Sequence, residues 1–340
     1  MTPLLTIAIP TYNRSNYLRM TLEQLASQLC NVPPGTAEVL VSDNCSPDDT
    51  GEVVKSLTSD LMPIRYIRNE TNLGWALNFA QAFDMAKGKY ILMSGDDDLL
   101  VDGALELLLE KLRGHDYGVV CMRPYGYDED FRAEKPEQPY SEKLFTDSQA
   151  FLVSVHRWFT LTSCLVMNKS LLAGVSSKEF IDTDLATFHL MLRASLAAKE
   201  NLFLNAYLLA SKRQNSSSYE YANVFVDQFW RIVDAHKAHG LRPATIRAIE
   251  TRRLFSYYPF YMFDLRSSGH GDIPATRAKL DRRFRGRLLY ELWLAPTLRL
   301  PRPLAIGWGA MTTAIGRAAS GDLRRGFKFA KRKLSRRVGR

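Results

Sequence analysis

The chain has 340 residues, of which 46% are hydrophobic, so it is long enough for one large or two ordinary domains with proper cores. This composition excludes a disordered chain and a small disulfide-stapled protein. The formal net charge is +9, but residues 299–340 alone hold 12 Lys and Arg against one acid, so the basic character belongs to the C-terminal tail. Four scattered cysteines without CxxC spacing argue against a zinc knuckle and fit a reducing compartment.

Strand-like and helix-like segments alternate through the first third of the chain. Short apolar runs at residues 4–9, 38–42, 64–68, 90–94 and 117–122 predict five strands. Helical patterns follow the first four runs, beginning near residues 16, 50, 76 and 102. This alternation predicts an α/β fold with a mostly parallel sheet that is flanked by helices.

Polar clusters stand at the carboxyl ends of the first four predicted strands. They read "PTYNR", "DNCSPDD", "RNETNLG" and "GDDD" in chain order. In open α/β sheets ligands bind outside the carboxyl ends of the strands, so we expect the four clusters to converge on one crevice.

Three consecutive carboxylates, Asp96, Asp97 and Asp98, follow the fourth apolar run directly. Carboxylates at this spacing resist joint ionisation unless a cation compensates, and Mg²⁺ or Mn²⁺ prefers such hard oxygen ligands. An ion held by few protein carboxylates keeps open positions for phosphate oxygens, so the triplet predicts a diphosphate ligand. The alternative is a solvated turn that caps the helix from Asp102.

Other residues at the strand ends admit two interpretations each. Asp43 can accept hydrogen bonds from a base or ribose, or form an ordinary Asx-turn before Pro47. Arg14 and Arg68 can face phosphates or be surface charges. Gly74 can let the backbone approach a ligand or serve the turn.

The segments "TIAIPTYNRSNYLRMTLEQL", "EVLVSDNCSPDDT" and "IRYIRNETNLGWALNFAQAFDMAKGKYILMSGDDDLL" together resemble family 2 glycosyltransferases. These are inverting enzymes of the GT-A fold, and the likeness is to the bacterial branch that adds sugars to surface polysaccharides. It covers residues 4–113 strongly and continues more weakly to about residue 220. The resemblance implies a GT-A domain at residues 1–222, with a nucleotide-sugar half at about 1–123 and an acceptor half at about 124–222.

The resemblance implies roles for individual residues. Asp98 and Asp96 would bind the metal, with Asp96 nearer the ribose, and Asp43 would contact the base. Arg213, in the late loop "SKRQNSSSY", would contact the diphosphate. The full set of implied donor-binding residues is Pro10, Thr11, Tyr12, Arg14, Asp43, Asn72, Gly74, Asp96, Asp97 and Arg213.

An inverting transfer also needs a general base that takes the proton of the acceptor hydroxyl. The stretch "FIDTDLATFHLMLRA" has the outline of the family's catalytic segment, which places Asp182 at the base position, with Asp184 as second candidate. Ile181 stands where the family usually has Glu. Otherwise these acids simply begin a helix, where the dipole favours negative charge. His189 is expected to be a packed helix residue.

Other nucleotide-binding classes fit less well. There is no GxGxxG after the first strand and no GxxxxGK[ST], which disfavours dinucleotide oxidoreductases and P-loop enzymes. A sugar nucleotidyltransferase would need a Gly-rich first loop, and a non-catalytic carbohydrate- or nucleotide-binding protein would not need "GDDD". No run approaches 18 apolar residues, so a single-addition enzyme is favoured over a membrane-embedded polymerising one.

The C-terminal third predicts a helical region at residues 223–300 and a basic amphipathic tail at 301–340. Apolar residues of the tail recur at helical spacing, with Lys and Arg between them: Leu323, Phe327, Ala330, Leu334 and Val338. This pattern is typical of a helix at an anionic membrane surface, with a nucleic-acid-binding or disordered tail as rivals. No signal peptide is predicted, so we expect a cytoplasmic enzyme, peripheral on the cytosolic face of the inner membrane. The expected partners are a nucleoside-diphosphate sugar and a glycan or polyprenyl-linked acceptor, with an anionic membrane surface bound through the tail.

Overall fold

The structure is a computed structural model that describes residues 2–60, 62–213, 220–269 and 271–319. The chain divides into two compact units. The first comprises Met1–Ser218 and Ile232–Leu241, and the second comprises Tyr219–Arg231 and Arg242–Arg340.

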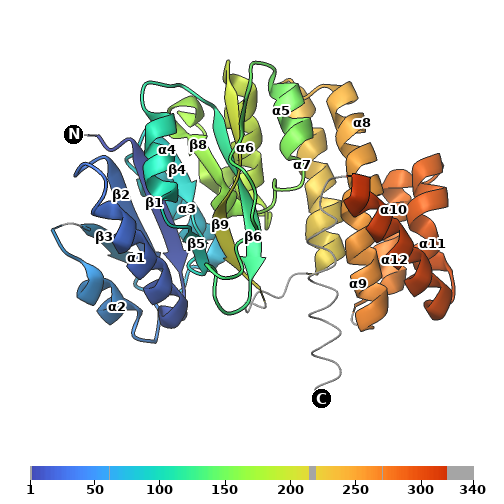
Figure 1. The fold of residues 1–340 in the computed structure, drawn as a ribbon, viewed down its shortest axis with the longest axis horizontal. Helices are drawn as coiled ribbons and strands as arrows, with labels where there is room; N and C mark the ends of the chain where they lie inside the picture. Colours follow the sequence, from blue (N-terminus) through green and yellow to red (C-terminus); the bar gives the residue numbers. More distant parts are fainter. Residues whose placement is uncertain (1, 61, 214–219, 270, 320–340) are drawn as a thin grey trace. The chain divides into compact units, whose positions relative to one another are not determined.

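The first unit opens with alternating strands and helices, as the sequence predicts (Figure 1). The elements are β1 (Leu5–Thr11), α1 (Ser15–Leu29), β2 (Ala37–Asp43), α2 (Thr50–Leu57), β3 (Ile64–Arg68), α3 (Trp75–Met85) and β4 (Tyr90–Met93). β1 pairs in parallel with β2 and with β4, and β2 pairs in parallel with β3. β1 and β4 are buried almost throughout, because helices cover both faces of the sheet.

The rest of the first unit extends this sheet with antiparallel pairs and with one parallel pair, β6 with β9. The elements are β5 (Asp98–Leu100), α4 (Ala104–Leu112), β6 (Val119–Tyr127), β7 (Glu142–Phe145), α5 (Ser148–Val155), β8 (Leu165–Asn168), α6 (Ala186–Ala197) and β9 (Asn201–Lys212). The strand order is β3-β2-β1-β4-β8-β6-β9-β5, with β7 paired to β9. The predicted α/β fold is confirmed, and the sheet is mixed because β8 enters antiparallel between β4 and β6.

The second unit is helical, as predicted for this region. It contains α8 (Pro243–Arg252), α9 (Tyr258–Ser268), α10 (Ile273–Phe284), α11 (Ala295–Arg299) and α12 (Arg302–Ala319), and α7 (Phe229–Ala235) runs from it into the first unit. The guanidinium of Arg253 is fully buried against the rings of Phe229 and Tyr257, at 3.8 and 3.9 Å from their centroids. The predicted tail helix at residues 323–338 lies outside the described residues. No helix within the described ranges is long and apolar enough to cross a membrane.

Candidate active site

The loops at the carboxyl ends of β1 and β2 are joined by hydrogen bonds. The N–H of Asn44 donates to the carbonyl of Thr11 at 3.0 Å. From α3, the Asn78 side chain donates to the Ser42 carbonyl at 2.9 Å and accepts from the Ser42 hydroxyl at 2.7 Å. The predicted clusters after these strands therefore meet at one edge of the sheet, and the start of α3 lies against them.

The acidic triplet is buried in the short connection between β4 and β5. Asp96, Asp97 and Asp98 are 4%, 6% and 7% exposed, so this segment is not a solvated turn. Arg14, just before α1, reaches Asp96 Oδ1 with Nη1 at 3.2 Å and Asp97 Oδ2 with Nη2 at 2.6 Å. The Thr11 hydroxyl donates to Asp96 Oδ2 at 2.8 Å. Four predicted donor-site residues thus form one polar cluster.

Asp98, the first residue of β5, has different partners. The hydroxyl of Ser163 donates to Asp98 Oδ2 and accepts from the N–H of Gly95 at 2.8 Å. Ser163 lies in the short helical turn Thr162–Cys164 that leads into β8. This side chain was missed by sequence reasoning, because a single serine in an apolar stretch carries no motif.

Burial disfavours the ionised form of two carboxyl groups of the triplet. Burial raises the pKa of Asp96 to about 7, and the neighbouring carboxylates add to this effect, while Arg14 and Thr11 oppose it. Burial and the charge of Asp97 raise the pKa of Asp98 to about 6, against hydrogen bonds that favour ionisation. Arg14 pairs with two of the three carboxylates, and three acidic side chains in one short segment are a donor set that suits a divalent cation.

The protein supplies few ligands for such a cation. Among the residues that the structure describes, no group of three His, Cys, Asp or Glu side chains is arranged to hold a metal ion.

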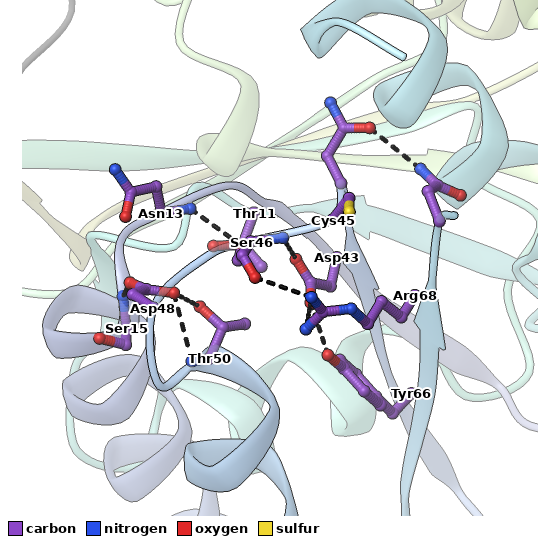
Figure 2. Close-up of polar contacts among 12 residues, drawn as sticks. Thr11, Asn13, Ser15, Asp43, Cys45, Ser46, Asp48, Thr50, Tyr66 and Arg68 are labelled. Atoms are coloured by element: carbon purple, nitrogen blue, oxygen red, sulfur yellow. Dashed lines mark hydrogen bonds and ion pairs between the residues drawn. The ribbon is translucent and has the colours of Figure 1, made fainter. Parts of the chain in front are cut away.

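Asp43 is fully buried at the end of β2, and Figure 2 shows Tyr66 and Arg68 of β3 directed at it. Its carboxylate accepts from the Tyr66 hydroxyl at 2.5 Å, from Arg68 Nη1 at 3.4 Å and from the Ser46 N–H at 2.9 Å. Burial and the bond to Asp43 raise the pKa of Tyr66 to about 12. Arg68 also donates to the Ser46 carbonyl at 2.9 Å, so it is bound to the loop that follows β2.

The loop before α3 is held by side-chain amides. Asn72 Oδ1 accepts from Asn44 Nδ2 at 2.7 Å and from the Gly74 N–H at 2.8 Å. Gly74 has φ of 83°, which favours glycine although a Cβ would meet no atom within 4 Å. Tyr12, after Pro10 near the end of β1, is exposed, as is Trp75 at the start of α3.

The candidate base residues lie before α6. Asp182 is exposed and Asp184 is half-buried. The helical turn just before them, Ser177–Phe180, contacts α3. The hydroxyl of Thr187, the second residue of α6, donates to that of Thr162 at 3.3 Å, and Thr162 adjoins the serine that binds Asp98. The start of α6 is therefore connected to the acidic triplet through the Thr162–Cys164 turn.

Two further predicted residues have structural partners. His189 stacks on Phe180 with ring centroids 4.3 Å apart, as expected for a packed helix residue. Arg213, at the end of β9, pairs with Asp128 at 3.2 Å and with Glu134 at 3.4 Å. The loop residues 214–219 that follow Arg213 lie outside the described residues.

The chain is similar to several known proteins. It is 31% identical over 167 residues to the abequosyltransferase RfbV of Salmonella typhimurium, covering 48% of each chain. It is 34% identical over 110 residues to the GalNAc(5)-diNAcBac-PP-undecaprenol beta-1,3-glucosyltransferase of Campylobacter jejuni, covering 32% of this chain and 34% of that protein. Each match thus spans less than half of the relative.

Solved structures support the fold. The structure of S. aureus TarS 1–349 in complex with UDP-GlcNAc covers 93% of this chain, and 92% of that chain is covered in turn, with a TM-score of 0.56 at 17% sequence identity. At this identity the likeness concerns the fold alone, and it agrees with the predicted GT-A architecture.

The family model described as glycosyl transferase family 2 matches residues 6–175, which is half of the chain. These residues run from β1 past β8 and include all four strand-end clusters, the acidic triplet and Ser163. The chain therefore belongs to glycosyl transferase family 2.

Proposed function

We propose that this protein is a metal-dependent inverting glycosyltransferase that moves a single sugar from a nucleoside-diphosphate sugar to a glycan acceptor. The observation that carries the proposal is the buried acidic triplet, which lies where the strand ends meet and in which burial raises the pKa of Asp96 and of Asp98. A divalent cation would stabilise the ionised carboxylates and bind the diphosphate of the donor.

Asp98 and Asp96 would hold Mg²⁺ or Mn²⁺, which when bound stabilises the negative charge of the departing diphosphate. Asp43 would contact the nucleoside through its carboxylate, which Tyr66 and Arg68 orient. Thr11 and Arg14 keep the triplet in place, and the exposed ring of Tyr12 offers an apolar surface beside the crevice. The other donor contacts in this proposal are Pro10, Asn72, Gly74, Asp97 and Arg213.

The acceptor hydroxyl attacks the anomeric carbon as the bond from that carbon to the diphosphate breaks, and its proton passes to a carboxylate of the protein. We assign that base to Asp182, whose exposed side chain is open to an incoming acceptor. Asp184 is the second candidate, because it lies closer to the buried start of α6. General-base catalysis contributes about 10²–10⁴ in rate.

The names of two relatives support the substrate class. One is an abequosyltransferase and the other acts on a glycan linked to PP-undecaprenol. We therefore place this chain in surface polysaccharide synthesis, with a polyprenyl-linked acceptor at the cytosolic membrane face. A non-catalytic carbohydrate- or nucleotide-binding protein and a sugar nucleotidyltransferase are the alternatives.

The test is a panel of nucleoside-diphosphate sugars incubated with polyprenyl-linked glycans, with Mn²⁺ or with chelator. We expect one donor to be consumed in Mn²⁺, with release of its nucleoside diphosphate and inversion at the anomeric carbon seen by NMR. Asp98→Ala should abolish release, whereas the surface control Asp60→Asn should not. Binding without transfer would identify a non-catalytic module, and donor cleavage that requires pyrophosphate would identify a nucleotidyltransferase.

A further inference from the structure

Exposed apolar side chains in the second unit are gathered on two helical stretches. Among the described residues of this unit, every large hydrophobic side chain that is exposed belongs to residues 288–292 or to α12. Leu288 and Leu292, one helical turn apart, are 77% and 67% exposed. Leu304, Met311 and Ile315 lie along one stripe of α12. We call these five side chains the apolar face.

The apolar face is not required for packing within the unit, because α12 packs through a different stripe. Ala305, Gly309, Thr312 and Gly316 are buried. A Cβ at Gly309 would lie 3.0 Å from Thr297 Cγ2 in α11 and 3.1 Å from Phe263 Cβ in α9. These small residues allow a close approach to α9 and α11, which leaves the larger side chains pointing outward.

From position 303 to position 318, after the exposed Arg302 at its start, α12 exposes no charged side chain. The exposed residues between positions 303 and 318 are Pro303, Leu304, Gly307, Ala310, Met311, Ala314, Ile315 and Ala318. A surface helix of a soluble unit normally presents charged or polar residues to water. An exposed surface of this kind, without a single hydrogen-bonding side chain, is typical of an interaction site.

The two stretches lie side by side. The Trp308 indole N–H in α12 donates to the carbonyl of Trp293 at 2.9 Å, and Trp293 belongs to η7 (Tyr290–Leu294), the helical segment before α11. Figure 1 shows α11 and α12 as neighbours in this unit. The apolar face therefore spans two adjacent helices.

Positive charge borders the apolar face on both sides in the sequence. On one side, Arg277, Arg282 and Arg285 line a concavity on α10, and Arg282 and Arg285 are largely exposed. The carboxylate of Asp281 there is shared by Arg277, Arg285 and Arg299, and that of Asp227 by Arg282 and Lys279, so the basic side chains outnumber the acidic ones. On the other side, residues 320–340 carry nine Lys and Arg against one acid.

We propose that the apolar face docks on an anionic lipid surface, with its leucines and isoleucine at the boundary between headgroups and acyl chains. The bordering arginines would lie at the level of the lipid phosphates. Basic charge next to an uncharged apolar surface is complementary to a bilayer, whereas a nucleic acid would leave the apolar side chains in water. This inference goes beyond the proposed transfer reaction and requires neither donor nor metal.

The test is co-sedimentation of the full chain with phosphatidylcholine vesicles that contain a minor fraction of phosphatidylglycerol. We expect Leu288→Ser/Leu292→Ser to lower the partition coefficient by about tenfold or more, because exposed leucines supply burial that salt does not screen. The matched control is Leu144→Ser/Leu171→Ser, which replaces two exposed leucines of the first unit. The control should bind as the wild type does, and far-ultraviolet circular dichroism should show both variants folded.

The salt dependence of vesicle binding distinguishes burial of the apolar face from simple charge attraction. In buffer of high ionic strength the wild type should keep a bound fraction that the Leu288→Ser/Leu292→Ser variant loses. Equal sedimentation of the two proteins would overturn the proposal. If ultracentrifugation without lipid shows a dimer of the wild type and a monomer of the variant, the apolar face binds a second copy of the chain instead. If duplex DNA displaces the wild type from vesicles, the face binds nucleic acid.

Discussion

Asp96→Asn should change how the stability of the metal-free protein depends on pH. The pKa of Asp96 is about 7 in the fold against an ordinary value of 3.8, so the folded state binds this proton more tightly than the unfolded state does. Stability contributed by the protonated form is present at low pH and is lost as pH rises between about 4 and 7. A shift of about three pKa units corresponds to roughly 4 kcal/mol.

The Asp96→Asn variant keeps a side-chain oxygen that can accept the hydrogen bond from the Thr11 hydroxyl, but its side chain cannot ionise. In chelator, the apparent free energy of unfolding of the wild type should therefore fall between pH 5 and pH 8 by roughly 2.5 kcal/mol more than that of Asp96→Asn, because part of the loss occurs below pH 5. Urea unfolding followed by tryptophan fluorescence at several pH values measures this, with Asp60→Asn as the surface control. Addition of Mn²⁺ should flatten the wild-type profile. Parallel profiles for the wild type and Asp96→Asn would refute the claim that burial raises the pKa of Asp96.

Two substitutions and one truncation test separate parts of the proposed function. Asp182→Asn should retain donor and metal affinity and lose about 10²–10⁴ in turnover, and if Asp184→Asn shows this signature instead, the base is two residues later. Ser163→Ala should weaken Mn²⁺ binding, measured by calorimetry at fixed nucleotide concentration, because Asp98 loses the hydrogen bond from the Ser163 hydroxyl. Ser163→Thr keeps a hydroxyl and should restore Mn²⁺ binding. Truncation after Ser320 should lower binding to anionic vesicles in a salt-sensitive way and leave metal-dependent donor binding unchanged, and equal sedimentation of both forms would rule out the tail as an anchor.

The N-terminal half of the fold could be predicted because its signals are local. The helix at residues 50–57 and the strand at residues 64–68 have the predicted bounds, and the four polar clusters stand at the ends of parallel strands. The fourth helix begins at Ala104 rather than Asp102, because Gly103 has φ of 76° and ends the preceding turn.

The later half depends on contacts between distant residues, for which a single sequence carries little signal. Nothing in "LVMN" indicates that β8 enters antiparallel between β4 and β6. The bond from Ser163 to Asp98 joins residues 65 positions apart, and the pairing of Arg213 with Asp128 joins residues 85 apart. The exposed stripe of α12 is likewise set by a distant contact. Gly309 lies against α9, so the side chains on the opposite side of α12 are left exposed.

The central claim is that the acidic triplet binds a nucleoside diphosphate through a divalent cation. Calorimetric titration of the full chain with nucleoside diphosphates, in Mn²⁺ and in chelator, tests it most directly. We predict that one nucleoside diphosphate binds, that this binding is lost in chelator and in Asp98→Ala, and that it persists in Asp182→Asn. Equal affinity with and without the metal, or full affinity in Asp98→Ala, would contradict it.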